Sequence, residues 1–267
     1  MTDAASPRAP LDADALQAAA GPQWTVRLHT EAGSTNALAQ ASPTRNLVVV
    51  ADHQTAGRGR LDRAWVTPAG AALTFSAVVD PVVDAEWWPL VPLAAGYAVA
   101  RVVGGAVKWP NDVLLKDRKV SGILTERVSV RAHGGDKPLA VIGIGINVDQ
   151  ANGELPVPTA TSLSLAGRPR ERTELFAEVL HALRFSLGLL ATSPSALVNN
   201  YRGLCSTLDR QVRIDLPDGS VLEGRAVDID RHGRLVVEPP SGGRHAMYAG
   251  DVVHVRPWQQ HDGPDLP

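Results

Sequence analysis

The sequence predicts an α+β fold, in which a mixed, mostly antiparallel sheet packs with helices and is followed by a small β-barrel. Apolar β-branched runs such as 47–51 recur between segments with helical periodicity, which indicates buried strands and helices. Two strand-like segments flank a short polar turn at 116–118, as in a hairpin. Short apolar segments between turns recur after Cys205, which is typical of a small barrel. We therefore expect a polar lead-in, a main domain, a barrel and a tail, at 1–22, 23–204, 205–258 and 259–267.

Length and composition place the chain among ordinary globular proteins. Its 267 residues are enough for a main domain with a sizeable core and one small domain. A net charge of −2 argues against broad nucleic-acid binding, which usually needs a basic face. The single cysteine, Cys205, excludes an intrachain disulfide, and we expect it to serve packing in a reducing cytoplasm. The first residues lack the basic start and long apolar core of a signal peptide, and we expect no membrane-spanning segment.

The first part of the chain predicts two helices and two strands. A short helix is expected at 11–20, and alternating apolar and polar residues indicate a half-buried strand at 24–29. Residues 34–36, Ser-Thr-Asn, precede a helix-forming run that begins at Ala37, which is an N-cap signal. A helix start with hydroxyls and an amide can also hold polar ligand groups, and both interpretations stay open. The buried strand at 47–51 follows.

A glycine–arginine loop comes next, at 54–65. Gly57 and Gly59 allow the close approach of backbone N–H groups to a ligand. Arg58 and Arg60 carry planar guanidinium groups that match carboxylate or phosphate oxygens. The loop matches neither the Walker P-loop nor the Rossmann fingerprint. Such a loop can close over an anion and exclude water, but a solvated basic turn has the same composition, so both interpretations stay open.

The central part of the chain predicts four strands and one helix. The helix is expected at 87–103, with two prolines near its start, where proline is best tolerated. The strands are expected at 71–79, 107–115, 119–126 and 139–148.

The strand expected at 119–126 carries different chemistry on its two faces. Strict alternation places Lys119, Ser121 and Ile123 on one face and Gly122 on the other. A glycine inside a strand often marks the close approach of a ligand or of another backbone. The two glycines of the next strand likewise leave room above the sheet.

The remaining segments complete the predicted fold. A loop rich in proline and glycine at 149–170 leads to a helix that is capped by Thr173, and a second short helix is expected at 194–202. Beyond Cys205, about five short strands are expected in the barrel. The first of these two helices carries a core-facing apolar stripe made of Phe176, Val179, Leu180, Leu183, Leu187 and Leu190.

Five of these stretches, taken in this order, resemble the motifs of the biotin protein ligases. The resemblance covers residues 24–256 and is most specific in the glycine–arginine loop and in the Lys-Trp-Pro-Asn-Asp segment. It implies a catalytic domain like that of the biotin and lipoyl ligases, followed by an SH3-like barrel. The matching stretches are Gly33-Ser34-Thr35-Asn36, Gln54-Thr55-Ala56-Gly57-Arg58-Gly59-Arg60, Lys108-Trp109-Pro110-Asn111-Asp112, Arg118-Lys119-Val120-Ser121-Gly122-Ile123-Leu124 and Gly143-Ile144-Gly145-Ile146-Asn147-Val148.

The resemblance implies an ATP-dependent ligase that works in two steps. The carboxylate of biotin attacks the α-phosphate of ATP, which gives biotinyl-5′-AMP and pyrophosphate. A lysine of a biotin carboxyl carrier protein, from an acetyl-CoA/acyl-CoA or pyruvate carboxylase, then attacks the adenylate and releases AMP. Mg²⁺ is expected to arrive with ATP, because no side-chain cluster in the sequence indicates a metal site. Chemistry of this kind depends on positioning and on cationic groups.

The resemblance also implies a role for each matching residue. Lys119 is the expected electrophilic group, with Arg58 as a further catalytic residue, and Asp112 is expected to position the acceptor lysine and accept its proton. The biotin-binding residues implied are Ser34, Thr35, Asn36, Gln54, Gly57, Arg58, Arg60, Lys119 and Gly122. The ATP- and adenylate-binding residues implied are Arg58, Gly59, Arg60, Trp65, Asn111, Lys119 and Asn147.

The chain departs from the family pattern after Arg60, where Leu61-Asp62 replace a further basic residue or a glycine. An exposed acid at this position should weaken anion binding by about 0.5 kcal/mol. About twenty residues precede the first expected core strand, which is fewer than a helix-turn-helix needs. The resemblance therefore implies a monofunctional ligase without a DNA-binding domain.

Three alternatives fit parts of the sequence. A lipoate or octanoate ligase shares the catalytic fold, and a biotin-sensing repressor shares the biotin site. A non-catalytic biotin-binding module has no need of Arg58, Arg60 and Lys119, since biotin alone requires no phosphate clamp. We expect a cytoplasmic protein that is a monomer or a ligand-dependent homodimer, with no DNA or membrane partner.

Overall fold

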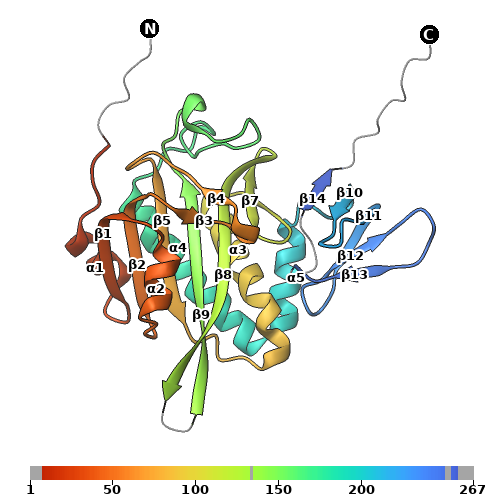
Figure 1. The fold of residues 1–267 in the computed structure, drawn as a ribbon, viewed down its shortest axis with the longest axis horizontal. Helices are drawn as coiled ribbons and strands as arrows, with labels where there is room; N and C mark the ends of the chain where they lie inside the picture. The colour runs from red at the N-terminus through yellow and green to blue at the C-terminus, as the bar shows by residue number, and fades with distance from the viewer. Residues whose placement is uncertain (1–7, 133–134, 250–253, 258–267) are drawn as a thin grey trace.

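A seven-stranded sheet forms the centre of the main domain in the computed structural model, which describes residues 8–132, 135–249 and 254–257 (Figure 1). Its strand order is β1-β2-β5-β9-β8-β7-β6. Only β1 and β2 pair in parallel and the other neighbours are antiparallel, which confirms the predicted mixed, mostly antiparallel sheet. The strands are β1 (Thr25–Ala32), β2 (Leu47–Gln54), β5 (Ala72–Val79), β6 (Ala106–Lys108), β7 (Asp112–Leu115), β8 (Arg118–Ala132) and β9 (Gly135–Asn147).

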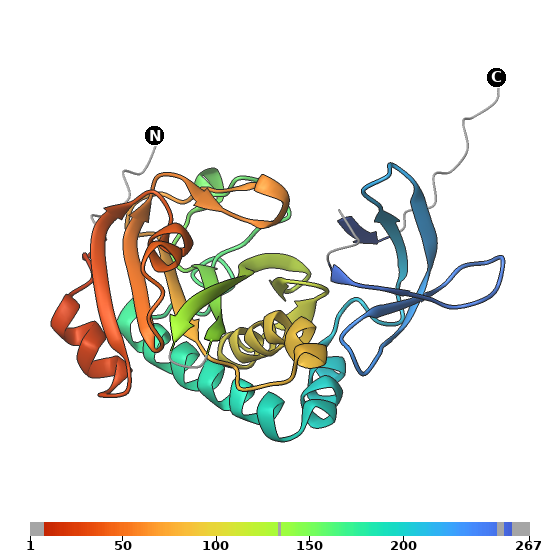
Figure 2. The same ribbon diagram turned by 60° about the horizontal axis from the view of Figure 1, so that its bottom comes forward.

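The helices cover the two faces of this sheet unequally (Figures 1 and 2). One face carries α1 (Ala13–Ala20), α3 (Val91–Val103), α4 (Arg172–Thr192) and α5 (Pro194–Leu204). The other carries the short α2 (Thr35–Ala41), which contacts β2, β5 and β9. The sheet therefore keeps part of its second face available for a site. Short 3₁₀ helices lie at η1 (Arg60–Asp62), η2 (Ala85–Leu90) and η3 (Asn152–Glu154).

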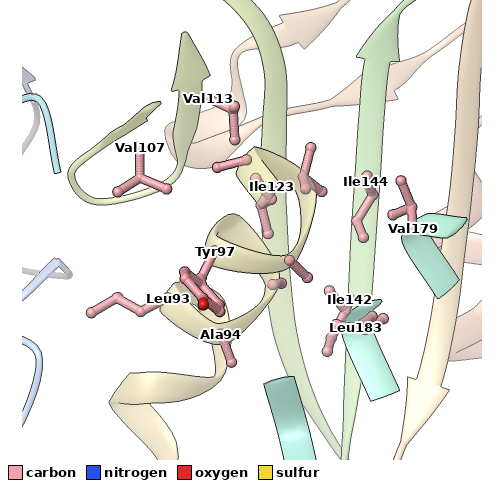
Figure 3. Packing of buried hydrophobic residues seen from close by; sticks show 14 of the residues in the cluster. Leu93, Ala94, Tyr97, Val107, Val113, Ile123, Ile142, Ile144, Val179 and Leu183 are labelled. Carbon is pink, nitrogen blue, oxygen red and sulfur yellow. The ribbon is translucent and has the colours of Figure 1, made fainter. Parts of the chain in front are cut away.

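The main core lies between the sheet and the α3–α4 layer (Figure 3). Tyr97 of α3 lies below Ile123 of β8 in this view, and Ile142 and Ile144 of β9 lie beside them. Leu93 points from the same helix toward the turn at Gly233, where a Cβ would lie 3.0 Å from the Leu93 side chain. These side chains are at most 5% exposed, so the sheet floor beneath the second face is held by dense apolar packing.

Helix α4 confirms the predicted apolar stripe but not its predicted cap. Glu171, and not Thr173, caps the helix, because its carboxylate accepts hydrogen bonds from the N–H groups of Thr173 and Glu174 at 2.9 and 2.7 Å. By length and hydropathy alone, α4 is long and apolar enough to cross a membrane, although no such segment was expected from the sequence. The six predicted stripe residues are buried in the core, as in the core helix of a globular domain.

The segment 107–115 is two strands, and the prediction of one continuous strand is wrong. β6 and β7 pair antiparallel around a turn at Trp109-Pro110-Asn111, with a cis peptide bond before Pro110. Proline has no N–H to donate to the ladder, so the strand is interrupted there. The turn places Asn111 and Asp112 at the rim of the sheet.

The C-terminal unit is a five-stranded antiparallel sheet in the order β13-β12-β11-β10-β14. Its core includes Val212, Ile214, Ala226, Leu235 and Val237, all at most 2% exposed. This confirms the five short strands expected after Cys205. The predicted tail at 259–267 and the first seven residues lie outside the described ranges. The strands are β10 (Gln211–Asp215), β11 (Val221–Ile229), β12 (Leu235–Glu238), β13 (His245–Met247) and β14 (His254–Pro257).

Cys205 sits where the main domain passes into this unit. Its thiol is buried, and burial raises the pKa of Cys205, so the reactive thiolate is disfavoured. The neighbouring Ser206 donates its N–H to the carbonyl of Val107 at 2.8 Å. The structure agrees with the packing role predicted for Cys205.

Trp109 joins the two units. The fully buried indole donates from Nε1 to the carbonyl oxygen of Gly233, at 3.0 Å. Gly233 has φ +79°, and a Cβ there would lie 2.8 Å from the Leu90 side chain. Only glycine at this position therefore allows the β11–β12 turn to contact the main domain. Beside it, Trp87 stacks on His232 with ring centroids 5.6 Å apart.

We expect Trp109→Phe to lower the free energy of unfolding by about 1–3 kcal/mol, because the buried Gly233 carbonyl loses its donor. Urea denaturation measures this change. Trp88→Phe is the control, since Trp88 is half-buried and its ring lies 4.8 Å from the Arg127 guanidinium, a contact that phenylalanine retains. Equal losses in the two variants would contradict the role given to the Trp109 hydrogen bond.

Candidate active site

A cleft lies on the second face of the sheet, between β8, β9, the start of α2 and a small hairpin. It encloses about 1040 Å³ of space open to solvent at its mouth. Apart from Gly57 and Asn147, all residues predicted for the site line this cleft. They are Ser34, Thr35, Asn36, Gln54, Arg58, Gly59, Arg60, Trp65, Asn111, Asp112, Lys119 and Gly122.

The small hairpin, which we call the flap, comprises residues 57–65 of the glycine–arginine loop and crosses in front of the sheet (Figure 1). Its strands β3 (Gly57–Arg58) and β4 (Ala64–Trp65) pair antiparallel, and the N–H of Gly59 donates to the carbonyl of Arg63 at 2.6 Å. Gly57 is buried against Trp65, where a Cβ would overlap the Trp65 carbonyl. The loop, for which a solvated basic turn and an anion-closing loop were both left open, is thus a hairpin whose residues line the cleft. Asp62, the departure from the family pattern, is exposed at its tip and is not among the cleft-lining residues.

The cleft floor is bare backbone. Gly122 of β8 and Gly145 of β9 are register partners, and the indole of Trp65 rests on both. A Cβ at Gly145 would lie 2.5 Å from the indole, and one at Gly143 would overlap the Asn36 amide. The prediction that glycines leave room above the sheet is confirmed, and Trp65 and Asn36 use that room.

The start of α2 supplies a buried polar cluster at one end of the cleft. Ser34 caps the helix, accepting from the N–H of Ala37 at 3.4 Å. The N–H and hydroxyl of Thr35 donate to Gln54 Oε1 at 2.7 and 3.1 Å, and the hydroxyl of Ser76 lies 2.7 Å from Thr35 Oγ1. Capping, one of the two interpretations left open above, is confirmed. Ser34, Thr35 and Asn36 also line the cleft, and the second interpretation, that they hold polar ligand groups, stays a prediction.

Lys119 reaches the cleft through a β-bulge. In the β7–β8 pair Ser121 faces Val113, but Lys119 faces Leu114, so Val120 is an extra residue. The bulge turns Lys119 onto the cleft face with Gly122, while Ser121 and Ile123 are buried on the opposite side. The prediction that Lys119 shares a face with Ser121 and Ile123 is therefore wrong.

The ammonium group of Lys119 is held from two sides. Its Nζ lies 2.6 Å from Asp112 Oδ1 and 5.8 Å from the centroid of the Trp65 ring. The backbone N–H of Lys119 donates to the carbonyl of Thr159, and the N–H of Thr161 donates to the carbonyl of Lys119, each at 2.8 Å. A segment of the 149–170 loop therefore fixes the start of β8. This backbone support had no signal in the sequence.

Two predicted asparagines use their amides to hold the structure. Asn111 lines the cleft, and its Nδ2 donates to the carbonyl of Ile123 at 3.0 Å. Asn147 is buried outside the cleft lining, where Nδ2 donates to the carbonyl of Thr161 at 2.9 Å and Oδ1 accepts from Gln150. The nucleotide contact predicted for Asn147 has no support in this geometry. Asn147 instead holds the loop segment that braces Lys119.

Arg60 extends from the flap toward the C-terminal unit. Its guanidinium donates to the backbone carbonyl of Ala249. Burial, and next the nearby charge of Arg63, lower the pKa of Arg60 from its ordinary value. A guanidinium nevertheless stays protonated at physiological pH, so the flap presents a fixed positive charge.

Sequence reasoning missed Glu126 and Ser76. Glu126 Oε2 accepts from Asn36 Nδ2 at 2.7 Å and lies 3.6 Å from the Arg58 guanidinium. The alternation of β8 from Gly122 through Leu124 offered a signal for Glu126, since it places all three on one face. Ser76 had no comparable signal, because its importance depends on α2 packing over β5.

The groups that line the cleft suit an anionic ligand. Lys119 and the flap arginines supply positive charge near bare backbone, and the α2 end supplies uncharged hydrogen-bonding groups. A ligand with a polar head and an activated carboxylate or phosphate fits this division. In the described ranges, no three His, Cys, Asp or Glu side chains are grouped to hold a metal ion.

Comparison with known proteins agrees with these features. Residues 29–147 match the Biotin/lipoate A/B protein ligase family, and residues 207–255 match the Biotin protein ligase C terminal domain, an SH3-like barrel. The chain is 36% identical to a biotin–[acetyl-CoA-carboxylase] ligase of Mycobacterium tuberculosis, over 96% of this chain and all of that protein. It is 31% identical to the bifunctional ligase/repressor BirA of Bacillus subtilis, over 80% of this chain and 68% of that protein. The structure of a biotin protein ligase from Aquifex aeolicus, in complex with biotin and ATP, is similar to this one with a TM-score of 0.73 and 26% sequence identity. The match covers 87% of this chain and 99% of that chain.

We expect Gly145→Ala to lower the free energy of unfolding by about 1–3 kcal/mol, because the methyl group displaces the Trp65 ring. Denaturation and the shift of tryptophan emission to longer wavelength measure the two effects. Gly188→Ala is the matched control: Gly188 lies in α4, where an added methyl group would meet no atom within 4 Å, and alanine favours a helix. A Gly145→Ala variant with wild-type stability and emission would show that Trp65 does not rest on the floor.

Proposed function

The chain belongs to the Biotin/lipoate A/B protein ligase family, and we propose that it is an ATP-dependent biotin protein ligase. The observation that carries this proposal is one cleft in which Lys119, Arg58 and Arg60 face a glycine floor beside the polar start of α2. The substrates are biotin and ATP, with Mg²⁺ entering on the nucleotide. The similarity to a biotin–[acetyl-CoA-carboxylase] ligase along the whole of that relative supports the same assignment.

The first step joins biotin to AMP. A biotin carboxylate oxygen bonds to the α-phosphorus of ATP, the bond from that phosphorus to the bridging oxygen breaks, and pyrophosphate leaves. Thr35 and Gln54, already hydrogen-bonded to each other, form the end of the cleft that takes the uncharged biotin head. Lys119 and Arg60 place positive charge where the reacting oxygens meet, which lowers the barrier by charge stabilisation.

The flap protects the product of this step. Biotinyl-5′-AMP is a mixed anhydride that water hydrolyses, so a closed hairpin has a direct use. Trp65 covers the floor, and Arg58, Gly59 and Arg60 line the cleft, all from the same flap.

The second step transfers biotin to an amine. The acceptor lysine nitrogen bonds to the carbonyl carbon of the adenylate, and AMP leaves with the bonding electrons. Asp112 lies at the rim beside Lys119, 2.6 Å from its Nζ, where its carboxylate can accept the proton released by the amine. Proton acceptance within hydrogen-bond reach is the requirement for a general base.

The acceptor is a biotin carboxyl carrier protein, with the acetyl-CoA carboxylase carrier as first choice and acyl-CoA or pyruvate carboxylase carriers as further substrates. We place the reaction in the cytoplasm and propose a monomer or a ligand-dependent homodimer, without DNA or membrane binding. The similarity to a named acetyl-CoA-carboxylase ligase supports the first choice.

Intact mass of a purified carrier domain tests the substrate. The domain is incubated with this protein, Mg-ATP and equal amounts of biotin and lipoate. We expect a shift of one biotin, because the α2 end offers hydrogen bonds to a polar head group. The shift should vanish when the acceptor lysine is replaced by arginine. A lipoyl shift would overturn the substrate while keeping the chemistry.

We expect Lys119→Ala and Arg58→Ala each to slow adenylate formation by about 100-fold or more, since each removes a cation facing the reacting oxygens. Pyrophosphate release measures the rate. The melting temperature should change little, because both ion pairs are partly exposed and such pairs stabilise weakly. Lys137→Ala, in the exposed part of the β8–β9 hairpin, is the control. Parallel losses of activity and stability would refute the catalytic roles.

A further inference from the structure

Glu126 is a charged side chain on the cleft face of β8 that the mechanism above does not use. It follows Gly122 and Leu124 at alternate positions, so the three point the same way from the strand. Glu126 is 29% exposed and lies beyond the bare part of the floor, where side chains of α2 reach β8. A carboxylate at that position faces both the helix and the flap.

One oxygen of this carboxylate meets donors from two separate segments. From α2, Asn36 Nδ2 donates to Glu126 Oε2 at 2.7 Å and Gln40 Nε2 donates at 2.5 Å. From the flap, the guanidinium of Arg58 lies 3.6 Å from the same oxygen. Glu126 therefore connects the head-group end of the cleft to the flap.

Each strand of the flap contributes an attachment to the floor. Trp65 on β4 is the apolar attachment, resting on Gly122 and Gly145. Arg58 on β3 is the polar attachment, paired with Glu126. Because Arg58 faces Ala64 in the hairpin register, fixing the Arg58 side chain also fixes the strand that carries Trp65.

We propose that Glu126 is a positioning residue that holds the flap over the cleft through Arg58. This proposal deepens the ligase function proposed above and rests on it. The Glu126 charge holds Arg58 in the closed arrangement of the flap, so the flap closes over bound biotin and ATP at a lower cost. Loss of the charge raises the cost of closing the flap, which appears in KM because binding then has to supply that cost.

The variant Glu126→Gln isolates the charge, since glutamine keeps an oxygen that can accept from Asn36 and Gln40. Trypsin is the probe of the flap, because Arg60 and Arg63 are cleavage sites within it. We expect cleavage after these residues to become about two- to fivefold faster at subsaturating biotin and ATP, as the loss of a partly exposed ion pair implies. Saturating biotin and ATP should remove the difference. KM for both substrates should rise about two- to fivefold, with kcat changed less than about twofold.

A double-mutant cycle separates this role from a structural one. In an Arg58→Gln background, Glu126→Gln should have no further effect on cleavage after Arg60 and Arg63 or on KM. An undiminished effect in that background would show that Glu126 acts only through α2, and would overturn the proposal. So would wild-type cleavage and KM in the Glu126→Gln single variant.

Glu178→Gln is the matched control, because Glu178 is an exposed carboxylate of α4 paired with Arg170 away from the cleft. It should leave flap cleavage and KM unchanged. The proteolysis readout needs no biotin transfer, so it decides the flap proposal even if the carrier stays unmodified. Conversely, normal biotinylation with unaltered cleavage and KM in Glu126→Gln would overturn the role of Glu126 and leave the ligase function standing.

Discussion

Close contact between side chains and bare strand backbone governs the arrangement of the cleft. Trp65 rests on Gly122 and Gly145, and Asn36 lies over Gly143, at separations that a methyl group would abolish. The glycines act by what they lack: their missing side chains bring the flap and the start of α2 down onto the sheet. The core on the other face, packed by α3 and α4, makes that floor rigid. A soft floor would not hold an indole and an amide in fixed places.

The charged side chains of the site are positioned around this floor. The bulge at Val120 turns Lys119 onto the cleft face, and the turn at Trp109-Pro110-Asn111 brings Asp112 to within 2.6 Å of it. The same turn joins the C-terminal unit through Trp109, while Arg60 contacts Ala249. The C-terminal barrel is thus coupled to the site from two directions, through the rim of the cleft and through the flap.

Most of the fold could be predicted from the sequence because each element obeys a local rule. Period-two alternation and β-branched runs marked the strands, and the apolar stripe of α4 marked its buried face. The errors had both local and distant causes. The cap of α4 is Glu171 because its carboxylate reaches the N–H groups of the first turn. Asn147, whose nucleotide contact stays a prediction, lies outside the cleft lining, and its amide donates to the carbonyl of Thr161, a partner 14 residues away.

By itself, the sequence determined the residue types that the chemistry needs: glycines for the floor, arginines and Lys119 for charge, and a polar helix start. Only the tertiary structure decided which of them meet. Strict alternation along β8 predicts that Lys119 and Gly122 lie on opposite faces. In the structure the pairing with β7 leaves Val120 as an extra residue, and this bulge places Lys119 on the same face as Gly122. Likewise, nothing local marks Glu126 as the partner of Arg58, 68 positions earlier in the chain. Spacing along a chain sets local conformation, whereas the contact between two charges depends on how the segments that carry them pack.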